Sequence, residues 1–397
     1  MSSKADWILD LLKSYKQQSL KIPIFVSDWD TLNEEAEYPL KFISNALNMN
    51  STSVLPYTFS DEQDEIKQLV LKELGRGNVI LAESNLAISL SATAALYLSI
   101  ISLYKQGQRR FLLFTPVYYS IIETLKDLKA DIFYYHLLDR SAFAIDFDRL
   151  ENMLANNIDV LFISDPVYCV GKDISQVLLK RIADLCNKYN CYLFLDNTLG
   201  GLEWEGTATG VFNHNKIESV KSAEKYLIVD SLTKRMLVNG LKHALIFADE
   251  RLVSEIEDLA SQVYGGFCFP QLQLMRELYA GQNIKEVSDM LQHNIQLIKA
   301  NYKLLNSFLI GSPFSLYEAN SGYFTMIVHD RYLSSEVNIE AQIKSCLYDF
   351  NTFLLPPWYF NFDDQNHFGV RVNLLKQPSS YLSSFEQCIR KNVKLLH

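Results

Sequence analysis

The chain has 397 residues, of which 48% are hydrophobic and 21% are charged, so a packed globular core is expected. Its formal net charge is -9 and no run of Lys or Arg stands out, which argues against binding to nucleic acid or to an anionic membrane surface. The longest apolar stretch, residues 92–104, contains hydroxyl side chains and is too short to cross a bilayer. No membrane segment is predicted.

The first residues predict a docked amphipathic helix and not an export signal. Lys4, Asp6 and Asp10 interrupt the segment, and apolar side chains recur at helical spacing across residues 7–15. The six cysteines include no C-x-x-C pair, and no two of the seven histidines have metal-ligand spacing. We therefore expect a cytoplasmic protein with reduced thiols and no metal ion.

Short apolar runs then alternate with amphipathic stretches of helical length. The predicted strands are 88–90, 110–114, 131–136, 160–163, 192–195, 226–229 and 244–247. The predicted helices are 94–105, 119–129, 175–190 and 251–263. This alternation indicates an α/β domain built around a mainly parallel sheet that is flanked by helices.

The pattern changes after about residue 285. A long predicted helix, 285–307, is followed by strands at 323–328 and 369–373, which indicates a smaller α+β domain. The N-terminal residues have no sheet pattern and are expected to pack on that domain or on a partner subunit. The predicted division is an N-terminal arm that forms part of the small domain (1–55), a large domain (56–284) and a C-terminal small domain (285–397).

Ligands of open parallel sheets bind where the strands end, so the residues that follow each strand are candidates. Lys234 follows the strand 226–229, where a neutral amine held beside a dry cleft can attack a carbonyl group. The hydroxyls of Ser231 and Thr233 could bind a phosphate, and Lys242 adds a second cation. Taken alone, a lysine in a solvent-exposed loop is the commoner interpretation.

Two further strand ends carry candidates. Asp196 closes an apolar strand, and a buried carboxylate needs a partner such as a pyridinium N–H group. Ser91, Ala92 and Thr93 precede a helix, whose first backbone N–H groups suit a phosphate. A capping aspartate and an ordinary strand-to-helix turn are the alternative interpretations.

Tyr118 and Arg371 complete the candidates. Tyr118 lies just past a strand and could stack on a flat ring, although aromatic residues there are more often core. Arg371 lies in a late β-branched strand, and its planar guanidinium suits a carboxylate. Most strand arginines, however, are exposed and form no important pair.

The order of these features resembles the fold type I pyridoxal-phosphate enzymes, specifically the class I/II aminotransferases, over roughly residues 20 to 395. Supporting matches are Tyr57 with Lys67 ten residues later, Phe269-Pro270-Gln271, Ser321-Gly322-Tyr323-Phe324 and Pro356-Pro357-Trp358-Tyr359. The resemblance implies a large domain with a mainly parallel, mixed sheet and a smaller α+β domain. It also implies a homodimer with shared active sites, in which Tyr57 reaches the cofactor phosphate of the other subunit.

The resemblance implies roles for the candidate residues. Lys234 would form the internal aldimine with pyridoxal 5'-phosphate and move the proton between the substrate α-carbon and the cofactor. Asp196 would keep the ring nitrogen protonated, Tyr118 would stack on the ring, and Arg371 would clamp the substrate carboxylate. The phosphate would be bound by Ser91, Ala92, Thr93, Ser231, Thr233 and Lys242.

Four positions depart from the family pattern. Ser91 replaces a glycine of the phosphate turn, and Lys242 replaces the phosphate arginine, which keeps the charge but loses the bidentate geometry. Tyr168 and Leu199 replace the asparagine and the tyrosine that bind the cofactor 3'-oxygen. We hypothesise that the Tyr168 hydroxyl supplies the missing hydrogen bond.

Three functions remain open from the sequence. The first is an aminotransferase that interconverts an amino acid and a 2-oxo acid. The second is a pyridoxal-phosphate-dependent lyase, cyclase or oxidase of specialised amino-acid metabolism on the same scaffold, which the altered 3'-oxygen partners favour. The third, ranked last, is a non-catalytic binding protein. A nicotinamide dehydrogenase is disfavoured because no G-x-G-x-x-G follows a predicted strand.

Overall fold

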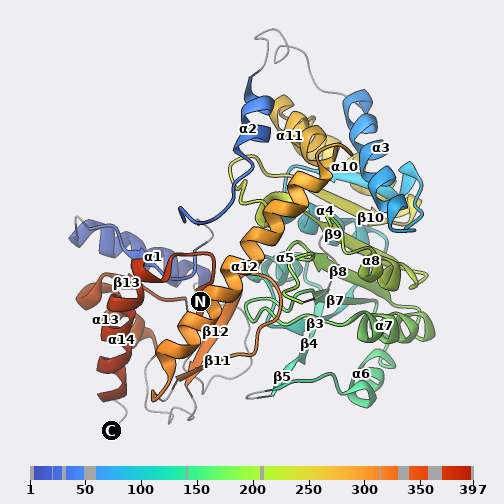
Figure 1. The fold of residues 1–397 in the computed structure, drawn as a ribbon. Helices are drawn as coiled ribbons and strands as arrows, with labels where there is room; N and C mark the ends of the chain where they lie inside the picture. The colour runs from blue at the N-terminus through green and yellow to red at the C-terminus, as the bar shows by residue number, and fades with distance from the viewer. Residues whose placement is uncertain are drawn as a thin grey trace.

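The protein is described by a computed structural model that covers residues 4–19, 21–28, 33–48, 60–139, 142–205, 210–312, 314–329, 339–355 and 369–394. Helices surround a central sheet, and the C-terminal helices and strands form a smaller group beside it (Figure 1).

In the described part of the chain, seven strands form the central sheet in the order β2-β10-β9-β8-β7-β3-β4. Their bounds are β2 Leu86–Ser89, β3 Arg110–Thr115, β4 Asp131–His136, β7 Val160–Ser164, β8 Tyr192–Asn197, β9 Tyr226–Asp230 and β10 Ala244–Ala248. Neighbouring strands are parallel except at β10, which is antiparallel to both β2 and β9. The predicted mainly parallel sheet is confirmed. For every strand of this sheet, the predicted first and last residues lie within two residues of the observed ones.

The inner strands β7 to β10 are buried along their whole length, as expected for a sheet that is covered on both faces. One face is covered by α4 (Ala92–Lys105), α5 (Tyr119–Asp127) and α10 (Glu250–Tyr264). The other is covered by α6 (Phe147–Leu154), α7 (Gln176–Lys188) and α8 (His214–Lys221). The α5 helix ends before its predicted limit because Lys129 adopts a φ of 57°, a left-handed conformation that terminates helices.

The C-terminal part begins with a long helix, α12 (Ile284–Leu309), and contains a three-stranded antiparallel sheet. Its strands are β11 (Phe314–Leu316), β12 (Phe324–His329) and β14 (Gly369–Asn373). The helices α13 (Ile339–Phe350) and α14 (Leu382–Lys394), with the short η4 (Pro378–Ser380), complete it. The predicted smaller α+β unit is therefore confirmed.

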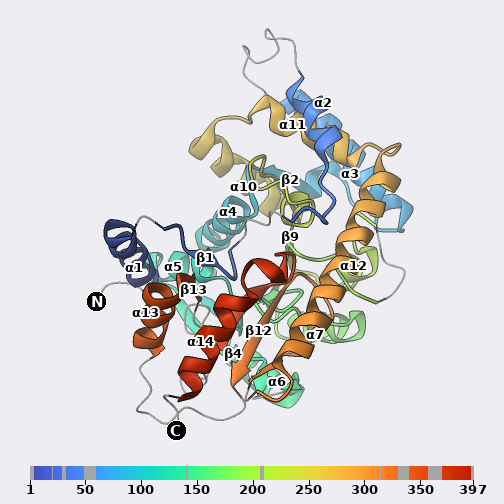
Figure 2. The same ribbon diagram turned by 60° about the vertical axis from the view of Figure 1, so that its left-hand side comes forward.

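The N-terminal helix α1 (Lys4–Gln18) lies beside α13 (Figure 2), and its buried Leu11 and Tyr15 belong to the same apolar cluster as Leu347. The expected packing of the N-terminus on the C-terminal unit is confirmed for this helix. A two-residue strand, β1 (Ile24–Phe25), was not predicted and pairs with β13 (Thr352–Phe353).

The remaining N-terminal elements approach the large sheet. The helices α2 (Leu40–Leu47) and α3 (Ser60–Arg76) pack against α11 (Phe269–Tyr279). Four small elements complete the described structure: η2 (Glu83–Asn85), β5 (Leu138–Asp139), β6 (Ala142–Phe143) and α9 (Leu232–Arg235).

Candidate active site

A cavity of about 230 Å³ lies where the parallel strands end, as expected for a sheet of this type. It is lined by Ala92, Thr93, Leu96, Tyr118, Ser164, Asp165, Pro166, Tyr168, Asp196, Thr198, Leu199, Lys234 and Lys242. Seven of the residues predicted for the site thus surround one space, namely Ala92, Thr93, Tyr118, Tyr168, Asp196, Lys234 and Lys242. These residues come from segments that lie up to 150 residues apart in the sequence.

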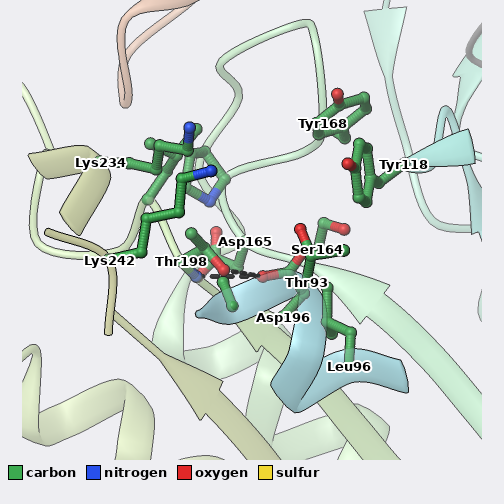
Figure 3. A pocket seen from close by; sticks show the side chains of 13 residues that line it. Thr93, Leu96, Tyr118, Ser164, Asp165, Tyr168, Asp196, Thr198, Lys234 and Lys242 are labelled. Carbon is green, nitrogen blue, oxygen red and sulfur yellow. Dashed lines mark hydrogen bonds between the residues drawn. The ribbon is translucent and has the colours of Figure 1, made fainter. Parts of the chain in front are cut away.

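Two lysines form one side of the cavity. Lys234 lies on the four-residue helix α9 (Leu232–Arg235), which begins directly after β9. Its ammonium donates a hydrogen bond to Asn239 Oδ1 at 3.0 Å. Figure 3 shows the Lys234 and Lys242 side chains together on one side, with Tyr118 and Tyr168 on the other. Both lysines therefore line the same cavity as the two tyrosine rings.

Three predicted phosphate ligands, Ser91, Ser231 and Thr233, are not among the residues that line the cavity. The hydroxyls of Ser231 and Thr233 both donate to the carbonyl oxygen of His243, at 2.5 and 3.0 Å, and neither residue lines the cavity. Ser91 caps α4, and its hydroxyl accepts the backbone N–H of Ala94 at 3.1 Å. These side chains satisfy backbone groups that burial would otherwise leave unpaired, and phosphate binding by their hydroxyls stays a prediction. They anchor the segments that carry the neighbouring cavity residues.

Asp196 is the last residue but one of β8 and is buried. One carboxylate oxygen accepts hydrogen bonds from the Thr198 hydroxyl at 2.5 Å and from the Thr198 backbone N–H at 3.1 Å. Burial raises the pKa of Asp196, while the two bonds from Thr198 act in the opposite direction. A cationic ring N–H bound in the cavity would stabilise the ionised form further, as a direct consequence of Coulomb attraction at low dielectric.

The tyrosine wall is connected to the C-terminal sheet. The rings of Tyr118 and Tyr168 lie 5.8 Å apart and tilted, and burial raises the pKa of Tyr118 to about 12. Burial also raises the pKa of Tyr168, so its hydroxyl keeps its proton near neutral pH. That hydroxyl accepts a hydrogen bond from Arg371 at 3.1 Å, and Arg371 donates a second bond to the carbonyl oxygen of Ser27 at 2.6 Å. Arg371 is 2% exposed and reaches the cavity wall through Tyr168.

Other lining residues were not singled out from the sequence. Thr198 was missed because its hydrogen bonds to Asp196 depend on the turn after β8, which no sequence pattern predicts. Asp165 belongs to a buried cluster in which the Lys216 ammonium contacts the carboxylates of Asp165, Asp173 and Glu203. Burial lowers the pKa of Lys216, but the three carboxylates outweigh it and raise that pKa above its ordinary value.

Two of the predicted features, Tyr57 and the segment 356–359, lie outside the described residues. Lys67, which shares a motif with Tyr57 in the sequence, lies on α3 and forms an ion pair with Glu257 at 2.7 Å. Its ammonium is thus already paired within the subunit.

The side chains present match the groups of pyridoxal 5'-phosphate. Lys234 offers an amine for an aldehyde, Asp196 a carboxylate for a ring nitrogen, and Lys242 a cation for a phosphate beside the start of α4. The buried hydroxyl of Ser164 also lines the cavity and has no hydrogen-bond partner among the described residues. A buried polar atom of this kind is commonly satisfied by a ligand or by water.

Membrane-spanning helices and metal centres are both absent from the described residues. No helix there combines the length and the apolar character needed to span a membrane. Within the same residues, no group of three or more His, Cys, Asp or Glu side chains is arranged to hold a metal ion.

Comparison with known proteins identifies the family of the chain. A family model described as aminotransferase class I and II matches residues 31–373. An aspartate aminotransferase of Pyrococcus horikoshii is 23% identical over 208 residues, which are 52% of this chain and 51% of that protein. The chain thus matches about half the length of this curated relative.

Solved structures share the whole fold. YbdL from Escherichia coli, for which a methionine aminotransferase function is described, has a TM-score of 0.80 at 14% identity and covers 98% of this chain and 97% of its own. Cystalysin from Treponema denticola, which contains pyridoxal 5'-phosphate, has a TM-score of 0.79 at 19% identity. The match covers 98% of this chain and 95% of the cystalysin chain. At these identities the likeness establishes the fold alone. The family model spans most of the chain, and the chain therefore belongs to the class I and II aminotransferase family.

Proposed function

We propose that the chain binds pyridoxal 5'-phosphate at Lys234 and transfers an amino group between an amino acid and a 2-oxo acid. The observation that carries this proposal is the single cavity that holds Lys234, Lys242, Asp196 and the first residues of α4. Family membership supports the same reaction class. When bound, the cofactor supplies an aldehyde that condenses with amines and a ring that accepts electrons from the substrate α-carbon.

The protein residues divide the remaining work. Lys234 provides a primary amine that can bond covalently to a carbonyl and, once released, carry a proton to or from the substrate α-carbon. Asp196 holds a proton on the ring nitrogen, because its buried carboxylate is most stable when it faces a cation. Lys242 and the start of α4 neutralise the phosphate. Burial of the site excludes water and strengthens each of these interactions.

Arg371 and Tyr168 are proposed to act as a pair. The Arg371 fork is suited to the substrate α-carboxylate, and the Tyr168 hydroxyl accepts a hydrogen bond from Arg371. The Tyr168 hydroxyl lines the cavity and is proposed to bind the 3'-oxygen of the cofactor, which is the bond hypothesised from the sequence. Substrate charge and ring chemistry would then be linked through one hydroxyl group.

A second function is favoured by two cavity residues. Tyr168 and Leu199 both line the cavity, at positions where the family pattern has an asparagine and a tyrosine. The 3'-oxygen environment therefore differs from that of the common pattern, which favours a lyase, cyclase or oxidase reaction on an amino acid. A non-catalytic binding protein ranks last, since it would not need an amine, an acid and a cation in one cavity.

Adding pyridoxal 5'-phosphate to the purified chain should produce a visible absorption band, and borohydride should then fix the label on the peptide that contains Lys234. Lys234→Ala should abolish the fixed label. Lys242→Met should retain it but weaken cofactor binding about 10–100-fold, because a charge-assisted hydrogen bond is worth roughly 1.5–3 kcal/mol. A protein that stays colourless would end the proposal.

Tyr168→Phe should raise the pH midpoint of that visible band by up to about one unit. The lost donor no longer stabilises negative charge on the 3'-oxygen, and one unit corresponds to roughly 1.4 kcal/mol. Tyr192→Phe is the matched control, because its hydroxyl bonds Gln106 at the other end of β8. An unchanged midpoint in Tyr168→Phe would remove that hydroxyl from the 3'-oxygen.

The two reaction classes separate in a single-turnover experiment. An aminotransferase incubated with its amino acid alone should convert the cofactor to the amine form and release one equivalent of 2-oxo acid per site. Adding a 2-oxo acid should restore the original spectrum. Continuous turnover with amino acid alone, and with the original spectrum retained, would instead establish the lyase, cyclase or oxidase alternative.

A homodimer with shared sites is also proposed, on the resemblance that places Tyr57 of a second subunit at the phosphate. Sedimentation should show a dimer, and Tyr57→Phe should weaken cofactor binding by about the value of one hydrogen bond, roughly 0.5–1.5 kcal/mol. A fully active monomer would contradict the assignment of Tyr57.

A further inference from the structure

A buried ion pair lies at the end of β9, and one of its residues directly follows the cavity residue Lys234 in the sequence. Arg235 follows Lys234 and contacts the carboxylate of Asp230, and both side chains are 0% exposed. Arg235 also donates from Nε to the carbonyl oxygen of Ser231 at 2.9 Å and from Nη1 to that of Val211 at 2.7 Å. The guanidinium therefore joins the end of β9, the helix α9 and the segment that precedes α8.

The second oxygen of Asp230 extends the network to the neighbouring strand. Asn197 donates from Nδ2 to Asp230 Oδ2 at 2.5 Å, and these two residues are paired in register across β8 and β9. Asn197 is 0% exposed and directly follows Asp196. The chain of contacts Asn197–Asp230–Arg235 thus starts one residue from Asp196 and ends one residue from Lys234.

The turn after β8 lies against two of these side chains, Asn197 and Arg235. A Cβ atom on Gly200 would overlap Asn197 Oδ1, so a glycine is required where the turn crosses the asparagine. Gly201 has a φ of +84°, and a Cβ there would lie 3.0 Å from Arg235 Nη1. This turn begins with Thr198, which bonds Asp196. The network therefore supports a cavity wall as well as two strand ends.

None of the three network residues lines the cavity, so their effect on a ligand must pass through the residues beside them. Stability alone does not explain them well. Burying an ion pair removes two charges from water, and apolar side chains of similar size often stabilise a protein as much or more. A charged network fixes the relative orientation of the groups that it joins, because each of its contacts is a hydrogen bond with a preferred geometry. Apolar packing has no such preferred direction.

We propose that Asn197, Asp230 and Arg235 form a positioning network that fixes the Lys234 amine and the Asp196 carboxylate relative to each other. This inference rests on the proposed function and adds the residues that set the geometry of its two central groups. Reactions that join an amine to a bound carbonyl group depend on that geometry, and a displacement of 1 Å can slow them about 10²-fold.

The test compares two ligands on folded variants of the full chain. Pyridoxal 5'-phosphate needs a correctly placed Lys234 amine, whereas pyridoxamine 5'-phosphate has no aldehyde and binds without covalent attachment. Arg235→Met should slow the appearance of the visible band by about 10²-fold, because the amine is displaced, and should leave pyridoxamine 5'-phosphate affinity within a few-fold of wild type. Arg235→Lys, which keeps the charge, should recover part of the rate.

Two further variants separate positioning from folding. Asp230→Asn/Arg235→Met removes both buried charges and keeps an acceptor for Asn197, so it should remain folded and attach the aldehyde as slowly as Arg235→Met. Arg76→Met breaks the ion pair with Glu73 on α3, away from the cavity. This control variant should attach the aldehyde at the wild-type rate. Urea unfolding of each variant establishes the conditions under which it is folded.

The outcomes are distinct. Slow attachment with retained pyridoxamine 5'-phosphate binding supports the positioning network. A wild-type rate in folded Arg235→Met or in the double variant overturns it and leaves the proposed function intact. A parallel loss of both ligands also overturns it, because a general loosening of the cavity would suffice. A wild-type chain that forms no visible band overturns the network and the proposed function together.

Discussion

Charge buried at the ends of apolar strands is the constraint on which the candidate site depends. Asp196 is the last residue but one of β8 and Asp230 is the last residue of β9, and both strands are fully buried. An unpaired carboxylate in such a place costs several kcal/mol, so each must be paired. Asp230 is paired with Arg235, and Asp196 receives two bonds from Thr198. The carboxylate of Asp196 can accept further donors, and it is the one that faces the cavity.

Sheet topology explains why two lysines meet in that cavity. The parallel strands end on the same side, which places Lys234 there, directly after β9. The strand β10 runs in the opposite direction, so its first residue, Ala244, lies at that same side of the sheet. Lys242 is two residues earlier and is therefore brought next to Lys234 by a single reversal of strand direction. The bonds that Ser231 and Thr233 make to His243 hold the two segments together.

The fold alone leaves the reaction open, because one fold can carry several reactions. We propose that the chemistry of this chain depends on the residues in which it differs from the family pattern. Tyr168 joins Arg371 to the cavity, and Leu199 contributes an apolar surface near Asp196. Both lie on segments fixed by buried polar contacts, and small changes there would alter the surroundings of a bound ring.

The sequence by itself determined the order of strands and helices and the candidates at the strand ends, Asp196 and Lys234. These follow from apolar runs and from residues next to them in the chain, which are local signals. Only the tertiary structure decided which groups pair with them. It turned the hydroxyls of Ser231 and Thr233 toward His243, and it joined Arg371 to Tyr168 across 203 residues of sequence. A buried polar group takes its partner from whichever segment is packed against it, and packing between distant segments leaves no periodic pattern in the sequence.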